Sequence, residues 1–238
     1  MRGRLLVAVL IIALGLAGTN LLLADISLQQ NVRLVTDIGL LMVTLVAVII
    51  TIVATANLVL SEQERGTIFL ILPKPISIGT FIGGKFIGLG AASLIIYLIL
   101  SLSVFGLAAF WYQLPWLNIG MTLLFGWLDL LVITALATLF ASFSQPILAT
   151  LLTAATYVIG HSLSLIVSAT AKGGLILYYL GRVIYYLMPN LEKFNLRETY
   201  VSASTLPASY YLWGLFYAVS YITVCLILAQ LALKRREW

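Results

Sequence analysis

The sequence has 238 residues, of which 62% are hydrophobic and 9% are charged, and its formal net charge is +5. Soluble globular domains carry about 25% charged residues, so this composition excludes a soluble globular protein. The positive charge does not indicate nucleic-acid binding, because the basic residues lie at the ends of apolar runs and do not form one basic stretch.

Six apolar runs are long enough to cross about 30 Å of hydrocarbon, which takes ~20 residues of α-helix. We therefore expect an all-α, polytopic membrane protein whose residues 1–238 form a single transmembrane domain. The expected spans are 5–24, 38–60, 86–110, 119–140, 146–169 and 209–233.

The first run follows Arg2 and Arg4, which is also the pattern of a cleaved signal peptide. The apolar stretch continues to Ala24, and no clean cleavage site precedes Asp25. We interpret this run as a retained transmembrane helix.

The basic residues predict the orientation, because cytoplasmic loops carry an excess of Lys and Arg. With the N-terminus inside, the cytoplasmic segments hold Arg2, Arg4, Arg65, Lys74, Lys85, Lys234, Arg235 and Arg236, and the outer ones hold Arg33, Lys172, Arg182, Lys193 and Arg197. We therefore expect a cell (inner or plasma) membrane protein with both termini in the cytoplasm.

Two hydrophilic segments separate the spans, an inner one at 61–85 and an outer one at 170–208. Within the outer segment, 175–188 is apolar but too short to span and contains Arg182, so we expect a re-entrant or interfacial helix there. Neither segment reaches the ~50 residues of a small independent domain. We therefore expect no nucleotide-binding domain and no ATPase site in this chain.

Residues 79–86, GTFIGGKF, match the spacing Gly-x-x-x-x-Gly-Lys of a nucleotide-binding P-loop. A P-loop follows a strand and continues with Ser or Thr, which binds Mg²⁺, whereas this chain has Phe86. We interpret Gly84, Gly88 and Ala92 as helix-packing positions, because small residues four apart allow transmembrane helices to approach closely. Lys85 is then an anchor at the inner interface.

The inner segment reads SEQERGTIFLIL and then PKP, which predicts a short interfacial helix ended by Pro73 and Pro75. On the residues alone, an ordinary interfacial loop is an equal alternative. However, Glu-x-Glu-Arg-x-Thr-Ile, Lys-Pro-Ile-Ser and Gly-Lys-Phe-x-Gly in this order resemble the inner loop of type-2 ABC transporter (ABC-2) permeases, in particular the multicopper-enzyme-maturation branch. YVIGHSLSL and YYLMPNLEKFNL fit the same family.

This resemblance implies a cytoplasmic coupling helix between helices 2 and 3, which contacts a separate ABC ATPase subunit. The residues that match are Glu62, Glu64, Arg65, Thr67, Lys74, Pro75, Ser77, Lys85 and Gly88, and the first seven would couple to the ATPase. The family often has a basic residue after Ser77, where this chain has Ile78. The implied complex is an exporter in the lipid membrane, with two ATPase copies that bind ATP and Mg²⁺ and a second permease copy or a sister permease.

Asp129 lies near the centre of the fourth expected span, where a carboxylate costs ~2.5–3.5 kcal/mol on insertion scales. One interpretation is that Asp129 contacts the substrate or transfers protons in the translocation path. The other is that it is a neutral, protonated side chain with a hydrogen bond to a neighbouring helix. His161 is the single histidine. With no Cys or carboxylate near it in the sequence, it does not indicate a metal site, and a helix-packing hydrogen bond is favoured over substrate contact.

Four aromatic residues of the last span recur at helical spacing, namely Tyr210, Trp213, Tyr217 and Tyr221. They predict a packing stripe, with Tyr217 and Tyr221 as further candidates for the translocation path. In the outer segment, the residues of interest are Arg182, Pro189, Asn190, Glu192, Lys193, Arg197 and Glu198. We expect this segment to be a solvated cap, with an outer gate or docking face as the alternative.

Two other functions stay open on the sequence. One is an ion-coupled carrier or channel that uses Asp129 and His161 without nucleotide. The other is a membrane scaffold that transports nothing.

Overall fold

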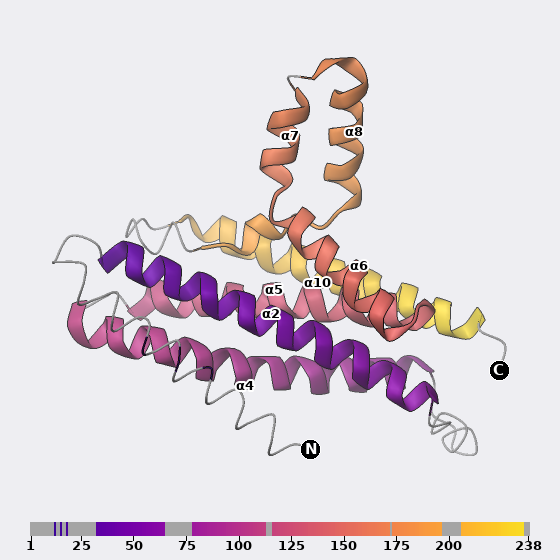
Figure 1. Ribbon diagram of the computed structural model, residues 1–238, viewed down its shortest axis with the longest axis horizontal. Coiled ribbons are helices and arrows are strands. Elements are labelled where there is room, and N and C mark those ends of the chain that lie inside the picture. The colour runs from indigo at the N-terminus through magenta and orange to yellow at the C-terminus, as the bar shows by residue number, and fades with distance from the viewer. Residues whose placement is uncertain are drawn as a thin grey trace.

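The computed structural model describes Ile12, Gly15 and Gly18 and residues 32–64, 78–112, 116–171, 173–196 and 206–235. All elements in these ranges are helices (Figure 1). They are α2 (Val32–Glu64), α4 (Ile78–Tyr112), α5 (Trp116–Phe143), α6 (Pro146–Gly160), α7 (Leu163–Ala171), α8 (Gly174–Leu187), the 3-10 helix η1 (Leu191–Phe194) and α10 (Ala208–Arg235). The all-α prediction is confirmed for this part of the chain.

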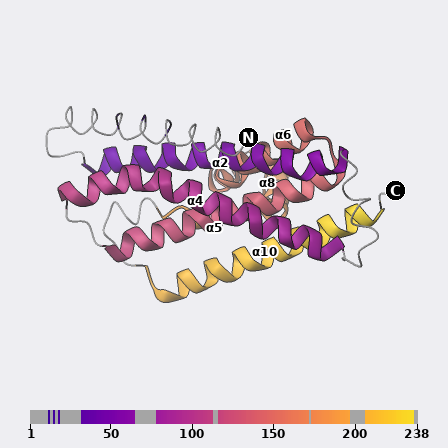
Figure 2. The same cartoon turned by 90° about the horizontal axis from the view of Figure 1, so that it is seen from below.

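Helix α5 forms the centre of a bundle in which α2, α4 and α10 run alongside it (Figures 1 and 2). It contacts all three of these helices and also α6 and η1. Of its apolar span, 61% is buried, compared with 22% for α10. Of the four long apolar helices, α5 is therefore the one most fully enclosed by protein.

Four described helices are long and apolar enough to cross a membrane, and they contain the expected spans 38–60, 86–110, 119–140 and 209–233. The stretches that meet this test are Asp37–Ala56, Gly79–Leu102, Asn118–Phe143 and Ala208–Lys234. The expected first span, 5–24, lies outside the described residues apart from Ile12, Gly15 and Gly18.

The expected fifth span, 146–169, is not one straight helix, although its two parts together are long and apolar enough to cross a membrane. It is divided into α6 and α7, which are bent by 63° at His161 and Ser162. The physical reason is a contact at the end of α6. Gly160 is buried there, and a Cβ on it would lie 2.7 Å from the Pro189 carbonyl oxygen. The returning chain therefore packs directly against the last residue of α6, where no side chain would fit.

The inner segment is shorter than expected, because helices cover both of its ends. Helix α2 continues to Glu64 and α4 begins at Ile78. Most of the expected coupling helix falls on 65–77, outside the described residues. Residues 79–86 lie inside α4, and a continuous helix does not wrap around a phosphate as a P-loop does.

Helices α7 and α8 form a hairpin that stands away from the bundle (Figure 1). The turn uses Gly174 at φ +86°, a left-handed conformation that glycine adopts without strain. Gly181 is buried against Thr170, where a Cβ would collide with the threonine side chain. The short apolar helix expected at 175–188 is confirmed as α8.

The outer faces of the bundle are apolar as well as its core. On α2, for example, Ile38, Met42, Leu45, Ile49 and Val53 are all exposed. A helix that is hydrophobic all round is found in a large core or in a membrane. The apolar outside of this bundle is therefore compatible with a transmembrane protein.

Candidate functional site

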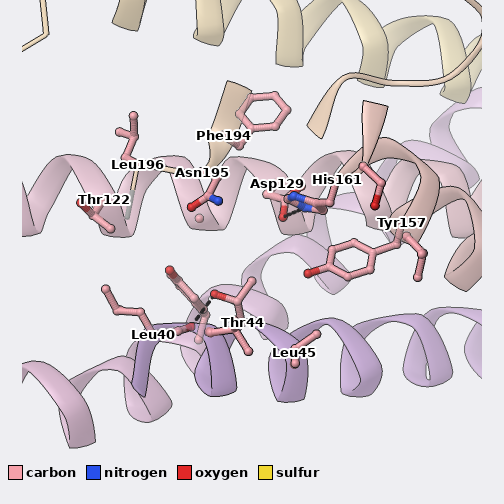
Figure 3. A pocket seen from close by; sticks show the side chains of 15 residues that line it. Leu40, Thr44, Leu45, Thr122, Asp129, Tyr157, His161, Phe194, Asn195 and Leu196 are labelled. Carbon is pink, nitrogen blue, oxygen red and sulfur yellow. Dashed lines mark hydrogen bonds and ion pairs between the residues drawn. The ribbon is translucent and has the colours of Figure 1, made fainter. Parts of the chain in front are cut away.

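A cavity of about 290 Å³ lies beside the middle of α5 (Figure 3). Its wall is formed by residues of α2, α4, α5 and α6, by His161 and Ser162 at the break after α6, and by the three residues 194–196. The residues that line it are Leu40, Leu41, Thr44, Leu45, Tyr97, Thr122, Gly126, Asp129, Tyr157, Val158, His161, Ser162, Phe194, Asn195 and Leu196. The lining thus combines polar and apolar groups, with a carboxylate and an imidazole among them.

Asp129 is the acidic residue of the cavity. It sits near the midpoint of α5 and is 2% exposed. An ionised carboxylate at this depth is expensive and has to face protein or a polar cavity, because lipid cannot solvate it. Its burial at the cavity wall meets that requirement.

His161 contacts Asp129 across the break between α6 and α7. The Nε2 atom of His161 lies 3.1 Å from Oδ2 of Asp129, although the two residues are 32 positions apart. The Tyr157 ring lies edge-on to the imidazole, with the ring centroids 4.6 Å apart. The bend thus gives the histidine its place opposite the carboxylate.

On the sequence, Asp129 and His161 are separate candidates, whereas in the structure they form a pair. The histidine has no carboxylate near it in the sequence, but the fold places Asp129 within hydrogen-bond distance of it. Within the described ranges, no three His, Cys, Asp or Glu side chains gather. The pair therefore lacks the further protein ligands of a tetrahedral zinc site.

Helix α4 contributes Tyr97, which is 2% exposed and packs on Gly126 of α5. A Cβ at Gly126 would collide with the Tyr97 hydroxyl group, so the glycine makes room for this ring. Close by, the Trp127 Nε1–H donates a hydrogen bond of 3.2 Å to the Gly90 carbonyl oxygen. These contacts fix α4 against α5 at the level of the cavity.

Residues 194–196 form the remaining wall, and the segment 188–196 that contains them is tied to α10. The Asn190 backbone N–H donates a hydrogen bond of 2.8 Å to the Tyr217 hydroxyl. The Tyr210 hydroxyl donates one of 2.9 Å to the Lys193 carbonyl, and the Lys193 ammonium lies 4.5 Å from the Tyr217 ring centroid. Phe194 is buried among aromatic side chains, 6.3 Å from the Phe125 centroid.

The outer segment is therefore not only a solvated cap, because Leu191, Phe194 and Leu196 belong to the hydrophobic core. Arg182 does remain exposed on α8 and donates hydrogen bonds to the Tyr178 and Tyr186 hydroxyls. These two bonds, that to Tyr178 first, hold the pKa of Arg182 above its usual value. Arg197 and Glu198 lie outside the described residues.

The two tyrosines that were candidates for the translocation path do not line the cavity. Tyr217 and Tyr221 are half-buried against the core, with their ring centroids 6.0 Å apart. Together with Tyr210 they form the expected packing stripe, whereas Trp213 is 69% exposed.

The expected packing positions Gly84, Gly88 and Ala92 lie on an exposed face of α4. A Cβ at Gly84 or Gly88 would meet nothing within 4 Å, so they make no close helix contact with the described residues. Gly90, which the sequence did not single out, is buried against Leu131.

None of the residues expected to couple to the ATPase lines the cavity. Arg65, Thr67, Lys74, Pro75 and Ser77 lie outside the described residues, and Glu62 and Glu64 form the end of α2. At the other end of the same segment, Lys85 on α4 lies 4.5 Å from the Phe81 ring centroid.

Sequence reasoning missed six polar residues of the cavity, Thr44, Tyr97, Thr122, Tyr157, Ser162 and Asn195. Tyr157 and Ser162 carried a signal, since both lie in YVIGHSLSL with His161. The two threonines look like ordinary polar residues of apolar spans, and Asn195 looks like part of the outer segment.

No model of a known protein family matches this chain, and no curated protein matches it.

Proposed function

We propose that the chain is the membrane-spanning subunit of an ATP-driven exporter of the ABC-2 type, whose substrate passes the Asp129–His161 cavity. The observation that carries this proposal is the cavity itself, which holds a buried carboxylate at the centre of a bundle with an apolar outside. Ionisable side chains at membrane depth characteristically mark substrate or ion paths. A scaffold that transports nothing has no evident use for them.

Two copies of a separate ABC ATPase would bind ATP and Mg²⁺ and supply the driving force. Their contact would be the inner segment 61–85 with Glu62, Glu64 and Arg65, which resembles the coupling loop of ABC-2 permeases. This segment joins two long helices, α2 of 33 residues and α4 of 35 residues. At 1.5 Å rise per residue, a displacement of the segment would be carried along both helices to the cavity wall.

A second copy of the chain, or a sister permease, would complete the transporter in the cell membrane, with both termini in the cytoplasm. Gly84, Gly88 and Ala92 lie on an exposed face of α4, and small residues at this spacing allow a second helix to approach closely.

The test is affinity purification of the chain from its own host in a mild detergent, followed by mass spectrometry and an ATPase assay. We expect a stoichiometric P-loop ATPase that is lost from the variant Glu64→Ala, Arg65→Ala. The matched control is Glu192→Ala, Lys193→Ala, which removes the same pair of charges from the outer segment and should retain the ATPase. A chain that purifies without any ATPase would overturn the ATP-driven function.

The contact between His161 and Asp129 favours a second candidate, a proton-coupled carrier. A carboxylate and an imidazole 3.1 Å apart can exchange a proton, as in the proton relays of pumps and transporters. This candidate predicts substrate movement that survives ATP depletion and stops when the proton gradient is collapsed. The ATP-driven function predicts the opposite pair of results.

A further inference from the structure

We propose that the cavity is a binding site for a small amphipathic amine, with its ammonium group against the Asp129 carboxylate and its apolar part against the leucine and phenylalanine side chains. This inference names the substrate class of the cavity, and it rests on the proposed function only where it places the cavity on the transport path.

The charge of the wall selects a cation. Asp129 is its acidic side chain, and no lysine or arginine that the structure describes lines the cavity. An ionised carboxylate inside a membrane bundle is stabilised by a positive partner, and among the lining residues His161 alone can provide one, when it is protonated. An ammonium group of a ligand can take that role and leave the imidazole neutral. A ligand carboxylate in the same place would be repelled by Asp129.

Two threonine hydroxyls of the wall favour a ligand that donates hydrogen bonds. The Thr44 hydroxyl donates its hydrogen bond to the Leu40 carbonyl at 2.8 Å, and the Thr122 hydroxyl donates to the Asn118 carbonyl at 2.9 Å. A hydroxyl has one proton and two lone pairs, so both oxygens can only accept from a ligand. These two acceptors and the Asp129 carboxylate belong to the same lining, so the wall offers oxygen acceptors to the N–H groups of a ligand.

The remaining wall and the volume set the size of the ligand. Apolar side chains from three parts of the chain, Leu40, Leu41, Leu45, Val158, Phe194 and Leu196, complete the lining. The volume of about 290 Å³ lies at the lower end of the ~300–1,000 Å³ that is usual for ligand pockets. A single aromatic ring or a short alkyl chain fits this space, whereas a whole phospholipid does not.

The experiment is equilibrium binding of tritiated 2-phenylethylamine to the full chain in lipid nanodiscs, measured by scintillation proximity. Unlabelled 2-phenylethylamine, 2-phenylethanol and phenylacetate compete as a cation, a neutral molecule and an anion of closely similar size. We expect saturable binding, with the alcohol and the acid weaker competitors by about tenfold or more. Equal competition by all three, or no saturable binding, would overturn the proposal. This comparison needs no substitution, so a folding defect cannot imitate its result.

Substitution of Asp129 then tests whether its carboxylate binds the amine. Asp129→Asn should weaken amine binding by about 10- to 100-fold, the range for loss of a charge-assisted hydrogen bond. Asp37→Asn, the same substitution on α2 outside the cavity lining, should change it by less than about twofold. Equal effects of the two variants would overturn the assignment to Asp129. Amine binding by a chain that copurifies with no ATPase would support the site and overturn the ATP-driven function separately.

Discussion

The Glu192 carboxylate caps the start of α7, because its Oε1 atom accepts hydrogen bonds from the Ser164 backbone N–H at 3.2 Å and from the Ser164 hydroxyl at 2.6 Å. The first N–H groups of a helix have no partner inside the helix, and a negative charge there interacts favourably with the helix dipole. Residues 191–194 thereby help to fix the direction in which the α7–α8 hairpin leaves the bundle.

Replacing this cap should loosen α7 while the bundle stays folded. Loss of a helix N-cap typically costs about 0.5–2 kcal/mol, so Glu192→Ala should speed hydrogen exchange of the α7 amides, measured by mass spectrometry. Ser168→Ala removes a hydroxyl that bonds within α7, to the Leu165 carbonyl, and serves as the control. Unchanged exchange in Glu192→Ala would show that the carboxylate does not hold the helix start.

The contact between Asp129 and His161 predicts that the two residues are energetically coupled. His161→Leu should destabilise the chain, because the buried carboxylate loses a polar partner, and this loss should be smaller once Asp129→Asn is also present. Unfolding in SDS titrations of the two single variants and the double variant gives the coupling energy. We expect it to exceed ~0.5 kcal/mol, the deviation that is usual for independent sites. Strict additivity would contradict the pair.

The hydroxyl of Tyr217 should be needed for the position of the cavity wall at 194–196. Tyr217→Phe removes the acceptor of the part-buried Asn190 N–H, and the loss of one hydrogen bond typically costs about 0.5–1.5 kcal/mol. The control is Tyr221→Phe on the same face of α10, since the structure describes no hydrogen bond of that hydroxyl. The free energy of unfolding should fall in the first variant only, and equal values for both would contradict the prediction.

The long helices could be predicted from the sequence, because the thickness of hydrocarbon requires long apolar runs and such runs are visible without any tertiary knowledge. The break at His161 could not be predicted in this way. Its causes, the Pro189 carbonyl beside Gly160 and the Glu192 cap on Ser164, come from residues 28 or more positions further along the chain. The hydropathy of residues 146–169 therefore gives no indication of these contacts.

The candidate site was predictable only in part, for a related reason. Asp129 stands out because a carboxylate in an apolar run is costly wherever it lies. His161 reaches Asp129 because of the bend between α6 and α7. Since hydropathy does not reveal this bend, it does not reveal the pair either. The burial of Leu191, Phe194 and Leu196 did leave a signal, since these apolar residues alternate with the charges of the outer segment.

Replacement of Gly160 by alanine should destabilise the chain, whereas the same replacement at an exposed glycine of α4 should not. In Gly160→Ala the new methyl group would lie 2.7 Å from the Pro189 carbonyl oxygen and 2.9 Å from two carbon atoms of Leu191. The backbone oxygen cannot move away as a flexible side chain would, so the returning segment has to shift. Overpacking of this kind typically costs about 1–3 kcal/mol.

The matched control is Gly88→Ala, in which the new Cβ meets nothing within 4 Å. Alanine is a better helix former than glycine, so this variant should be as stable as the unmodified chain or slightly more stable. Thermal unfolding in nanodiscs measures both variants. A lower unfolding temperature for Gly160→Ala alone indicates that the end of α6 is packed against 189–191. Equal stability of the two variants would contradict this packing, and with it the cause given for the bend.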